Sequence, residues 1–293
     1  YFPSISNKFK TFYDSKLNFD LTNSQKKVLK EIREDFSSKK QMNRLLQGDV
    51  GSGKTIVAIM SVIIAVENNF QSCIVAPTEI LAQQHFSTFI NYLSDININV
   101  EILTGSTTKL QRNLILSDLI IGKIDVLIGT HALFEDDVRF KNLGYVVIDE
   151  QHKFGVKQRS KMWKKNNPPP HVLIMTATPI PRTLTMSIYG DLDISIIDEM
   201  PPGRKDIVTV HRKDSNRLKV FAFLKDQIKS GRQVYIVYPL IEESKKMDLK
   251  FLEDGYESLL RDFPRDKYQV GVLHGKMKNN DKDFEMKRFI AGK

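Results

Sequence analysis

The sequence predicts an α/β protein built on an open parallel sheet. Short apolar segments of four to six residues alternate with helical patterns along the chain of 293 residues. Uninterrupted apolar segments of this length are typical of strands buried on both faces, and strand–helix alternation provides the crossovers that parallel strands require. A glycine-rich turn over residues 48–55 joins one such segment to a helical pattern.

The elements are expected in a regular order along the chain. A helix over residues 23–37 can be capped by Thr22 or Asn23 and carries apolar residues on one face. The six strands expected after it share a short apolar sequence and are residues 44–47, 72–76, 100–103, 125–129, 145–148 and 172–176. Helical patterns follow most of them, over residues 55–68, 80–93, 109–121 and 182–189. Beyond residue 206 the alternation predicts strands at 207–210, 233–238 and 269–273, and helices at 216–229, 255–262 and 281–290.

The chain length favours two domains, since a domain commonly holds about 100–200 residues. The best linker candidate reads PPGR at residues 201–204, because proline restricts the residue before it and glycine permits a turn. No clear period is evident before residue 20. We therefore expect an N-terminal extension over residues 1–19, a first domain over 20–200, a linker over 201–205 and a shorter second domain over 206–293.

The composition is that of an ordinary globular protein, with 41% hydrophobic and 27% charged residues. These values exclude collagen-like, low-complexity and wholly disordered classes. Cys73 is the only cysteine, which excludes an internal disulfide and a zinc site of four cysteines. The longest apolar stretch, residues 56–66, is too short to cross a bilayer, and the first residues do not resemble a signal peptide. We expect a cytoplasmic protein without a membrane partner.

The net charge of +9 is concentrated after residue 203, where 21 basic residues face 14 acidic ones. A local basic excess favours a polyanion partner, because contacts to phosphates release condensed counterions. The alternative is a basic surface that is merely solvated. The same two interpretations apply to residues 153–165, where six basic residues and Trp163 occur without an acid.

Residues 48–55 read GDVGSGKT and match the pattern of a phosphate-binding loop between a strand and a helix. Glycines let successive backbone N–H groups converge on a phosphate, and the helix N-terminus that follows adds partial positive charge. Lys54 is expected to contact the β- and γ-phosphates, and the Thr55 hydroxyl to bind Mg²⁺. The predicted ATP-binding residues of the loop are Gly48, Gly51, Ser52, Gly53, Lys54 and Thr55.

Two acids follow the apolar strand expected over residues 145–148. We expect Asp149 to orient Mg²⁺ through water and Glu150 to act as the general base that activates the attacking water. The alternative is a solvated acidic loop. Thr176 and Thr178 end another expected strand, where they either sense the γ-phosphate or merely satisfy the strand end. The histidines show no zinc-protease spacing, so His152 beside Gln151 is not a convincing metal ligand.

Together these features resemble the superfamily 2 nucleic-acid helicases, over about residues 19–293. The matching strings are FDLTNSQ at residues 19–25 for the adenine-contacting Q motif, PTEILAQQH at 77–85 for motif Ia, TGS at 104–106 and GTHALF at 129–134 for the motif Ib region, DEQH at 149–152, and TATPIPRTL at 176–184 for motif III. The resemblance implies an α/β P-loop NTPase fold with two RecA-like parallel-sheet domains, the second incomplete, and with ATP between them.

The resemblance also assigns roles to residues. It implies that Phe19 and Gln25 contact the adenine. It implies coupling between ATP and DNA through Gln151, His152, Thr176, Ala177 and Thr178. It implies DNA contacts from Pro77, Thr78, Glu79, Gln83, Thr104, Gly105, Ser106, Thr130 and His131. Lys153 and Lys276 stand where the family usually has arginine, which keeps the charge but removes the bidentate geometry.

Longer strings, such as DEQHKFGVKQR and MTATPIPRTL, are similar to those of bacterial motors that use Mg-ATP to remodel branched DNA. The function implied is an ATP-dependent DNA helicase acting on stalled forks and Holliday junctions in repair and recombination, as a monomer associated with the nucleoid. The alternatives are the motor of a transcription-repair coupling factor and a nucleotide-binding module without helicase activity. Motifs V and VI and an upstream wedge domain are not found in these 293 residues, so we expect slow ATP turnover from this segment alone.

Overall fold

The computed structural model describes residues 2, 7–38, 40–150, 165–178, 192–201, 207–238 and 247–292. The chain divides into two compact units, Tyr1–Lys205 and Asp206–Lys293. This division lies at the end of the predicted linker. Each unit is described by itself below. In the part of the chain that is described, no helix combines the length and apolar character needed to cross a membrane.

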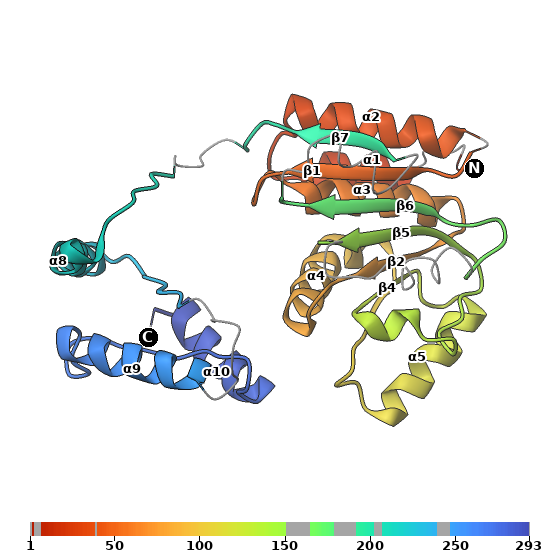
Figure 1. The fold of residues 1–293 in the computed structure, drawn as a ribbon. Coiled ribbons are helices and arrows are strands. Elements are labelled where there is room, and N and C mark those ends of the chain that lie inside the picture. Colours follow the sequence, from red (N-terminus) through yellow and green to blue (C-terminus); the bar gives the residue numbers. More distant parts are fainter. Residues whose placement is uncertain are drawn as a thin grey trace. The chain divides into compact units, whose positions relative to one another are not determined.

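The first unit contains a seven-stranded sheet in the order β3-β4-β2-β5-β6-β1-β7, and every neighbouring pair is parallel (Figure 1). The strands are β1 Asn43–Gly48, β2 Gln71–Val75, β3 Val100–Leu103, β4 Val126–Gly129, β5 Leu143–Asp149, β6 His171–Thr176 and β7 Asp193–Ile197. The predicted parallel α/β architecture is confirmed, and six of these strands agree with the predicted ones to within two residues. β2, β4 and β6 are buried along their whole length, as uninterrupted apolar segments predict.

Helices cover both faces of this sheet. They are α1 Asn7–Ser15, α2 Asn23–Ser37, α3 Lys54–Glu67, α4 Glu79–Leu93 and α5 Lys109–Ile121, with short 3₁₀ turns η1 Ser94–Ile96 and η2 His131–Phe134. Leu46 of β1 packs in a core with α1 to α4, whereas its neighbour Leu45 packs in a second core with α5 and η2. Successive residues of a strand point to opposite faces, so the two cores lie on opposite sides of the sheet.

The helix predicted over residues 23–37 forms as α2, and its predicted cap is confirmed. Thr22 accepts a hydrogen bond from the backbone of Gln25, and the side chain of Gln25 accepts one from the backbone of Thr22. This reciprocal pair satisfies two N–H groups at the start of the helix. It also fixes where Gln25 lies, which matters for the site below.

The described residues before residue 20 pack on the first unit, whereas an extension was predicted over residues 1–19. α1 packs on α3, and the backbone N–H of Phe9 donates to Glu67 Oε1 at 3.0 Å. Phe12 is fully buried, and Phe2 is buried in the same core. Aromatic side chains bury a large area each, so a few of them anchor a segment that shows no regular apolar period.

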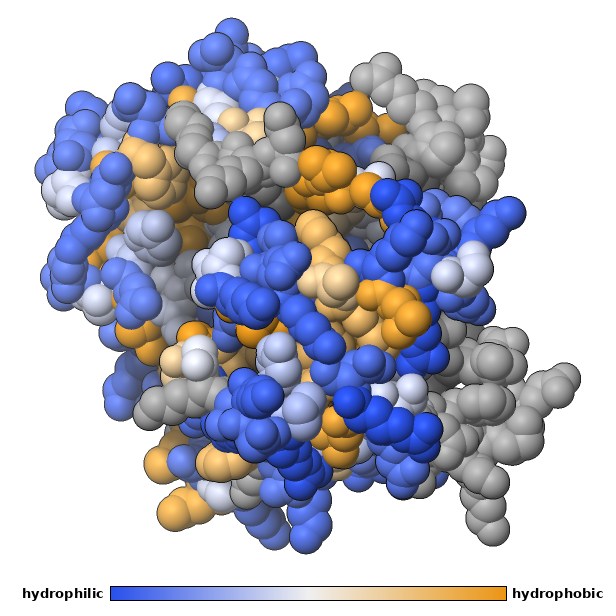
Figure 2. All heavy atoms as spheres, turned by 90° about the vertical axis from the view of Figure 1, so that its left-hand side faces the viewer, coloured by the Kyte–Doolittle hydropathy of each residue, from blue (hydrophilic) through white to orange (hydrophobic). Residues whose placement is uncertain are grey.

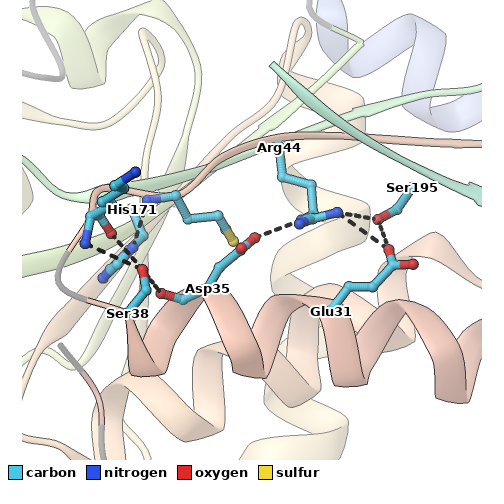
Figure 3. Close-up of polar contacts among 8 residues, drawn as sticks. Glu31, Asp35, Ser38, Arg44, His171 and Ser195 are labelled. Carbon is cyan, nitrogen blue, oxygen red and sulfur yellow. Dashed lines mark hydrogen bonds and ion pairs between the residues drawn. The ribbon is translucent and has the colours of Figure 1, made fainter. Parts of the chain in front are cut away.

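β7 was not expected, because polar residues interrupt its apolar pattern. One of them, Ser195, is buried beside Arg44 of β1 (Figure 3). Arg44 Nη1 donates to Ser195 Oγ at 2.8 Å and lies 3.2 Å from Glu31 Oε2, while Arg44 Nε donates to Asp35 Oδ2 at 2.7 Å. These contacts join α2 to the two neighbouring strands β1 and β7. We call these four residues the Arg44 cluster.

The second unit contains α8 Arg217–Lys229, α9 Met247–Asp262 and α10 Asn279–Ile290, preceded by the 3₁₀ turn η4 Asp214–Asn216. The helices predicted over 216–229 and 281–290 are confirmed to within two residues, whereas the one predicted over 255–262 begins eight residues earlier, at Met247. Phe221, Leu259 and Phe263 form a small core. The side chains of Leu218, Phe223 and Phe284 in this unit are exposed. Figure 2 shows apolar patches among hydrophilic surface on the side of the molecule that it draws.

The strands predicted at 207–210, 233–238 and 269–273 are wrong, since those described residues form no strand. Strands need hydrogen-bonded neighbours and a buried face for stability. Val208 and Val237 instead remain 84% and 85% exposed. The helix predicted over 182–189 lies outside the described residues, as does the basic segment from 153 to 164.

Candidate active site

Most of the predicted site residues that the structure describes gather at one edge of the sheet of the first unit, because parallel strands all end on the same side. The neighbouring strands β5, β6 and β1 lead to Asp149, Thr176 and the phosphate-binding loop. On the other half of the sheet, β2 and β4 lead to Pro77 and Thr130. The predicted catalytic residues and the predicted DNA contacts therefore occupy adjacent halves of one edge.

The loop between β1 and α3 requires glycine at two positions. Gly51 and Gly53 have φ angles of +79° and +87°, in the left-handed region that favours glycine. A Cβ atom on Gly53 would also overlap the side-chain amide of Gln25. α3 begins directly afterwards at Lys54, so its N-terminal N–H groups face the loop, as a phosphate site needs.

Gln25 is brought to this loop by α2. Its Nε2 donates to the backbone carbonyl of Ser52 at 2.8 Å, in a buried position. Gln25 therefore braces the loop and cannot be regarded only as an adenine contact. Phe19, the other predicted adenine contact, lies before α2 and is 45% exposed, so its ring is open to a ligand.

Lys54 lies at the centre of the site. Its Nζ donates to the carbonyl oxygens of Gly48 at 2.6 Å and Asp49 at 3.0 Å. Burial lowers the pKa of the Lys54 ammonium, and the charges of Asp149, Glu150 and Asp49 partly offset that effect. The loop lysine and the two predicted catalytic acids thus share one local electrostatic environment.

The residues around Lys54 fit a magnesium-bound triphosphate. Ser52 Oγ is buried without a hydrogen-bond partner in the described part of the chain, and a Cβ on Gly48 would lie 2.5 Å from it. Thr55 and Asp149 supply hard oxygen donors, which Mg²⁺ prefers. Among the described residues, no cluster of three His, Cys, Asp or Glu side chains could enclose a metal by itself. Mg²⁺ is usually bound by one or two carboxylates together with substrate phosphates, and Asp149 and Thr55 suit that arrangement.

Glu150 has an unusual backbone and a well-defined side chain. Its φ angle of +50° lies in the left-handed region, which costs of the order of 1–3 kcal/mol for a residue with a side chain. Its Oε1 accepts from the backbone N–H of Ala177 at 3.1 Å, and its Oε2 accepts from Thr176 Oγ1 at 3.3 Å. Thr176 Oγ1 in turn accepts from the backbone N–H of Thr178 at 3.1 Å. The predicted base is therefore joined directly to the predicted coupling residues.

Asp149 contacts a histidine that the sequence did not single out. His85 Nε2 lies 2.8 Å from Asp149 Oδ2, and the two side chains are 10% and 14% exposed. His85 belongs to the buried face of α4, together with Ala82, Phe89 and Leu93. A polar residue on an otherwise apolar helix face was the signal that could have identified it.

The predicted DNA contacts also form a connected group. Glu79 Oε1 accepts from the backbone N–H of Ser106 at 3.1 Å, and the hydroxyl groups of Thr104 and Ser106 lie 2.9 Å apart. Thr78 caps α4 by accepting from the backbone N–H of Leu81. The 77–79 and 104–106 segments are therefore neighbours, although 24 residues lie between them in the sequence.

The predicted DNA contacts differ in their exposure to solvent. Gly105, Ser106, Thr78, Gln83 and His131 are exposed, whereas Thr130 is only 2% exposed. The Thr130 side chain lies beneath the surface, where DNA cannot reach it directly. The exposed members are the ones able to contact a nucleic-acid backbone.

A family model described as "DEAD/DEAH box helicase" matches residues 22–187, more than half of the chain. The chain belongs to the DEAD/DEAH box helicase family. The segment matched contains the phosphate-binding loop, both acids and the coupling residues described above. The predicted P-loop fold and the predicted helicase family are therefore confirmed.

Curated relatives of this DEAD/DEAH box helicase are RecG proteins. The chain is 50% identical over 287 residues to the ATP-dependent DNA helicase RecG of Aquifex aeolicus, covering 98% of this chain and 36% of that protein. It is 48% identical over 275 residues to RecG of Bacillus subtilis, covering 94% of this chain and 40% of that protein. The chain thus spans little more than a third of the length of these relatives.

Two solved helicase structures are also similar to this chain. A structure of RecG bound to a three-way DNA junction is similar over 99% of this chain and 37% of the other, with 41% identity and a TM-score of 0.80. The DEAD-box helicase Mss116 bound to ssRNA and UDP-BeF covers 97% of this chain and 62% of the other, with a TM-score of 0.71 but 19% identity. The second likeness shows the fold alone.

The structure of this DEAD/DEAH box helicase domain brings most predicted site residues to the edge of one sheet. The loop residues, Gln25, Asp149, Glu150 and Thr176 to Thr178 form one group, and the 77–79 and 104–106 segments form another. Gln151 and His152 lie outside the described residues. His85 is the functional candidate that sequence reasoning missed.

Proposed function

We propose that this chain is the ATP-hydrolysing motor segment of a helicase that remodels branched DNA, such as stalled forks and Holliday junctions, in repair and recombination. The observation that carries the proposal is the placement of Glu150 between the loop lysine and the coupling residues. Its charge acts on Lys54, and its carboxylate accepts hydrogen bonds from Thr176 and Ala177. The choice of branched DNA is supported by the similarity to RecG proteins and to RecG bound to a three-way junction.

Binding of ATP follows from the loop geometry. The backbone N–H groups of residues 51–54 and the N-terminus of α3 supply donors and partial positive charge to the phosphates. Lys54 would exchange its bonds to the Gly48 and Asp49 carbonyls for charge-assisted bonds to phosphate oxygens. Thr55 and Asp149 would hold Mg²⁺, which as a Lewis acid neutralises phosphate charge when bound. Phe19, whose ring is exposed, would contact the base.

Hydrolysis requires a group that removes a proton from water. We assign this step to the Glu150 carboxylate, which takes one proton as the water oxygen bonds to the γ-phosphorus and the bond to the bridging oxygen of ADP breaks. The donors on Ala177 and Thr176 orient the carboxylate before the reaction. Protonation removes its charge and so weakens both bonds. The state of the nucleotide is thereby transmitted to residues 176–178.

DNA is the proposed partner, at the exposed edge formed by Thr78, Gly105, Ser106 and His131. Contacts made by loop backbones and small polar side chains suit phosphates and sugars, which carry no base sequence. The net charge of +9 favours such a polyanion. A monomeric state and a cytoplasmic, nucleoid-associated location belong to the same proposal.

The test is ATP turnover by the whole protein with a three-way DNA junction and with a linear duplex of equal length. We expect the junction to stimulate turnover strongly and the duplex to stimulate it weakly. Lys54→Ala should abolish turnover on both DNAs, because the ammonium contact to the phosphates is lost. Lys123→Ala, an exposed position between α5 and β4 at the opposite end of the sheet, is the control. Equal turnover with the two DNAs would refute the branched-DNA substrate, and turnover that survives Lys54→Ala would refute the site.

A further inference from the structure

The contact between His85 and Asp149 has a defined direction. A carboxylate carries no hydrogen, so the 2.8 Å contact between Nε2 and Oδ2 requires the histidine to donate. His85 therefore holds its proton on Nε2 when it is neutral. This bond reaches Asp149 from α4, an element that supplies none of the predicted nucleotide contacts.

The histidine itself is held in place by packing. Its ring meets the ring of Phe89, one turn further along α4, edge-on with centroids 6.5 Å apart. Phe89 is fully buried, as are Ala82 and Leu93 on the same helix face. A buried ring packed in this way cannot swing away from Asp149 without disturbing the core. The donor is therefore fixed relative to the end of β5.

We propose that His85 is a positioning residue that orients the Asp149 carboxylate for the magnesium-bound triphosphate. This inference rests on the proposed ATP-hydrolysing function. Hydrogen-bonded partners that orient metal-associated groups commonly affect metal affinity or activity by about 10–100-fold. Without His85, the carboxylate is free to rotate, and the Mg²⁺-dependent part of ATP binding is reduced. Binding of ATP without Mg²⁺ depends on the loop and Lys54 and should not change.

Two variants separate the hydrogen bond from the packing. His85→Gln retains an N–H donor near the position of Nε2, whereas His85→Phe retains a flat ring beside Phe89 but has no donor. Thr88→Ala is the matched control, because it removes a hydrogen bond to the Gln84 carbonyl on the same helix, away from Asp149. Affinity for a fluorescent ATP analogue is measured for each 293-residue variant in EDTA and in magnesium chloride.

We expect Mg²⁺ to raise the affinity of wild type, Thr88→Ala and His85→Gln by a similar factor. In His85→Phe that factor should fall by about tenfold, while the affinity in EDTA stays unchanged. The ratio within one variant does not depend on how much of the sample is folded, and His85→Ala replaces the Phe variant if the latter does not fold. A full Mg²⁺ effect in the donor-free variant would overturn the role of His85. Absence of a Mg²⁺ effect in wild type would instead refute the proposed ATP site.

Discussion

The side-chain amide of Gln25 fills the space that a Cβ atom on Gly53 would need. The same amide donates to the Ser52 carbonyl at 2.8 Å, so α2 closes over the loop just where the loop turns into α3. Gln25, which was predicted to contact the adenine, thus also supports the phosphate-binding loop. A mutation that displaces either the phosphate-binding loop or α2 should therefore also perturb the other.

Gly53→Ala is expected to destabilise the first unit and to weaken ATP binding. The left-handed backbone alone costs about 1–2 kcal/mol for a residue with a Cβ, and displacement of Gln25 breaks the bond to Ser52, worth about 1 kcal/mol more. Urea unfolding and ATP titration measure the two effects. Gly122→Ala is the control, because it has a similar φ of +81° but would meet only the flexible side chain of Lys141. Equal losses in the two variants would contradict the role of Gln25.

Glu150→Gln in the whole protein should bind ATP as wild type does but hydrolyse it at least a hundredfold more slowly, since general-base catalysis typically contributes about 10²–10⁴-fold. The amide cannot accept the proton from water, although it can still accept a hydrogen bond from Ala177. Single-turnover hydrolysis and ATP titration distinguish the two steps. Glu135→Gln, outside the site, is the control. Hydrolysis by Glu150→Gln at the wild-type rate would assign the base elsewhere.

We expect the protein to lose stability in mild acid because His171 is buried in its neutral form. Burial lowers its pKa from 6.5 to about 4, and its Nδ1 accepts from the Met42 backbone N–H at 2.9 Å. The unfolded chain binds a proton near pH 6.5 but the native state only near pH 4, so stability is full above pH 6.5 and falls as the pH drops toward 4. The loss approaches about 3 kcal/mol over this range.

Urea unfolding at pH 7 and pH 4.5 measures this loss. His171→Phe should be less stable at pH 7, because the Met42 N–H loses its acceptor, but its stability should change less with pH. His131→Phe, at an exposed position, should keep the wild-type pH dependence. If His171→Phe loses as much stability in acid as wild type does, then another group is responsible.

The Arg44 cluster should matter more to stability than a surface cluster of similar composition. Arg44→Met is expected to cost about 2–3 kcal/mol, somewhat less than for fully buried pairs because Glu31 and Asp35 are partly exposed. Arg112 also contacts two carboxylates, those of Glu135 and Asp137, but both are about half exposed. Arg112→Met should therefore cost less than about 1 kcal/mol. Urea unfolding compares them, and equal losses would contradict this ranking.

Most of the first unit could be predicted because its signals are local. The strand over residues 100–103 and the helix over 109–121 appear with the predicted bounds, and Thr22 caps α2 as expected. β7 escaped prediction because the burial of Ser195 depends on Arg44, which is distant in sequence. The strands predicted in the second unit failed for a related reason, since an apolar segment becomes a strand only when neighbours pair with it.

Part of the candidate site was predicted from the sequence and part was not, for the same reason. The loop residues and the acids were found because strand–turn–helix patterns place them at one sheet edge. The bond from Gln25 to Ser52 and the one from His85 to Asp149 join segments 27 and 64 residues apart. No local pattern encodes such pairs, since they arise only when the helices pack on the sheet. Single-sequence reasoning therefore identifies the reacting groups more readily than the residues that orient them.

The strand order has a consequence for synthesis on the ribosome. β1 is the first strand of this sheet to be made, yet its two neighbours, β6 and β7, end at Thr176 and Ile197. For most of the time that this unit is being translated, β1 therefore has two unpaired edges, and unpaired edges invite association with other chains. Nucleotide cannot stabilise the nascent chain during this interval, because the phosphate-binding loop follows β1, which pairs only with the late strands β6 and β7. This helicase domain should therefore depend on chaperones early and on ATP only after its last strand has emerged.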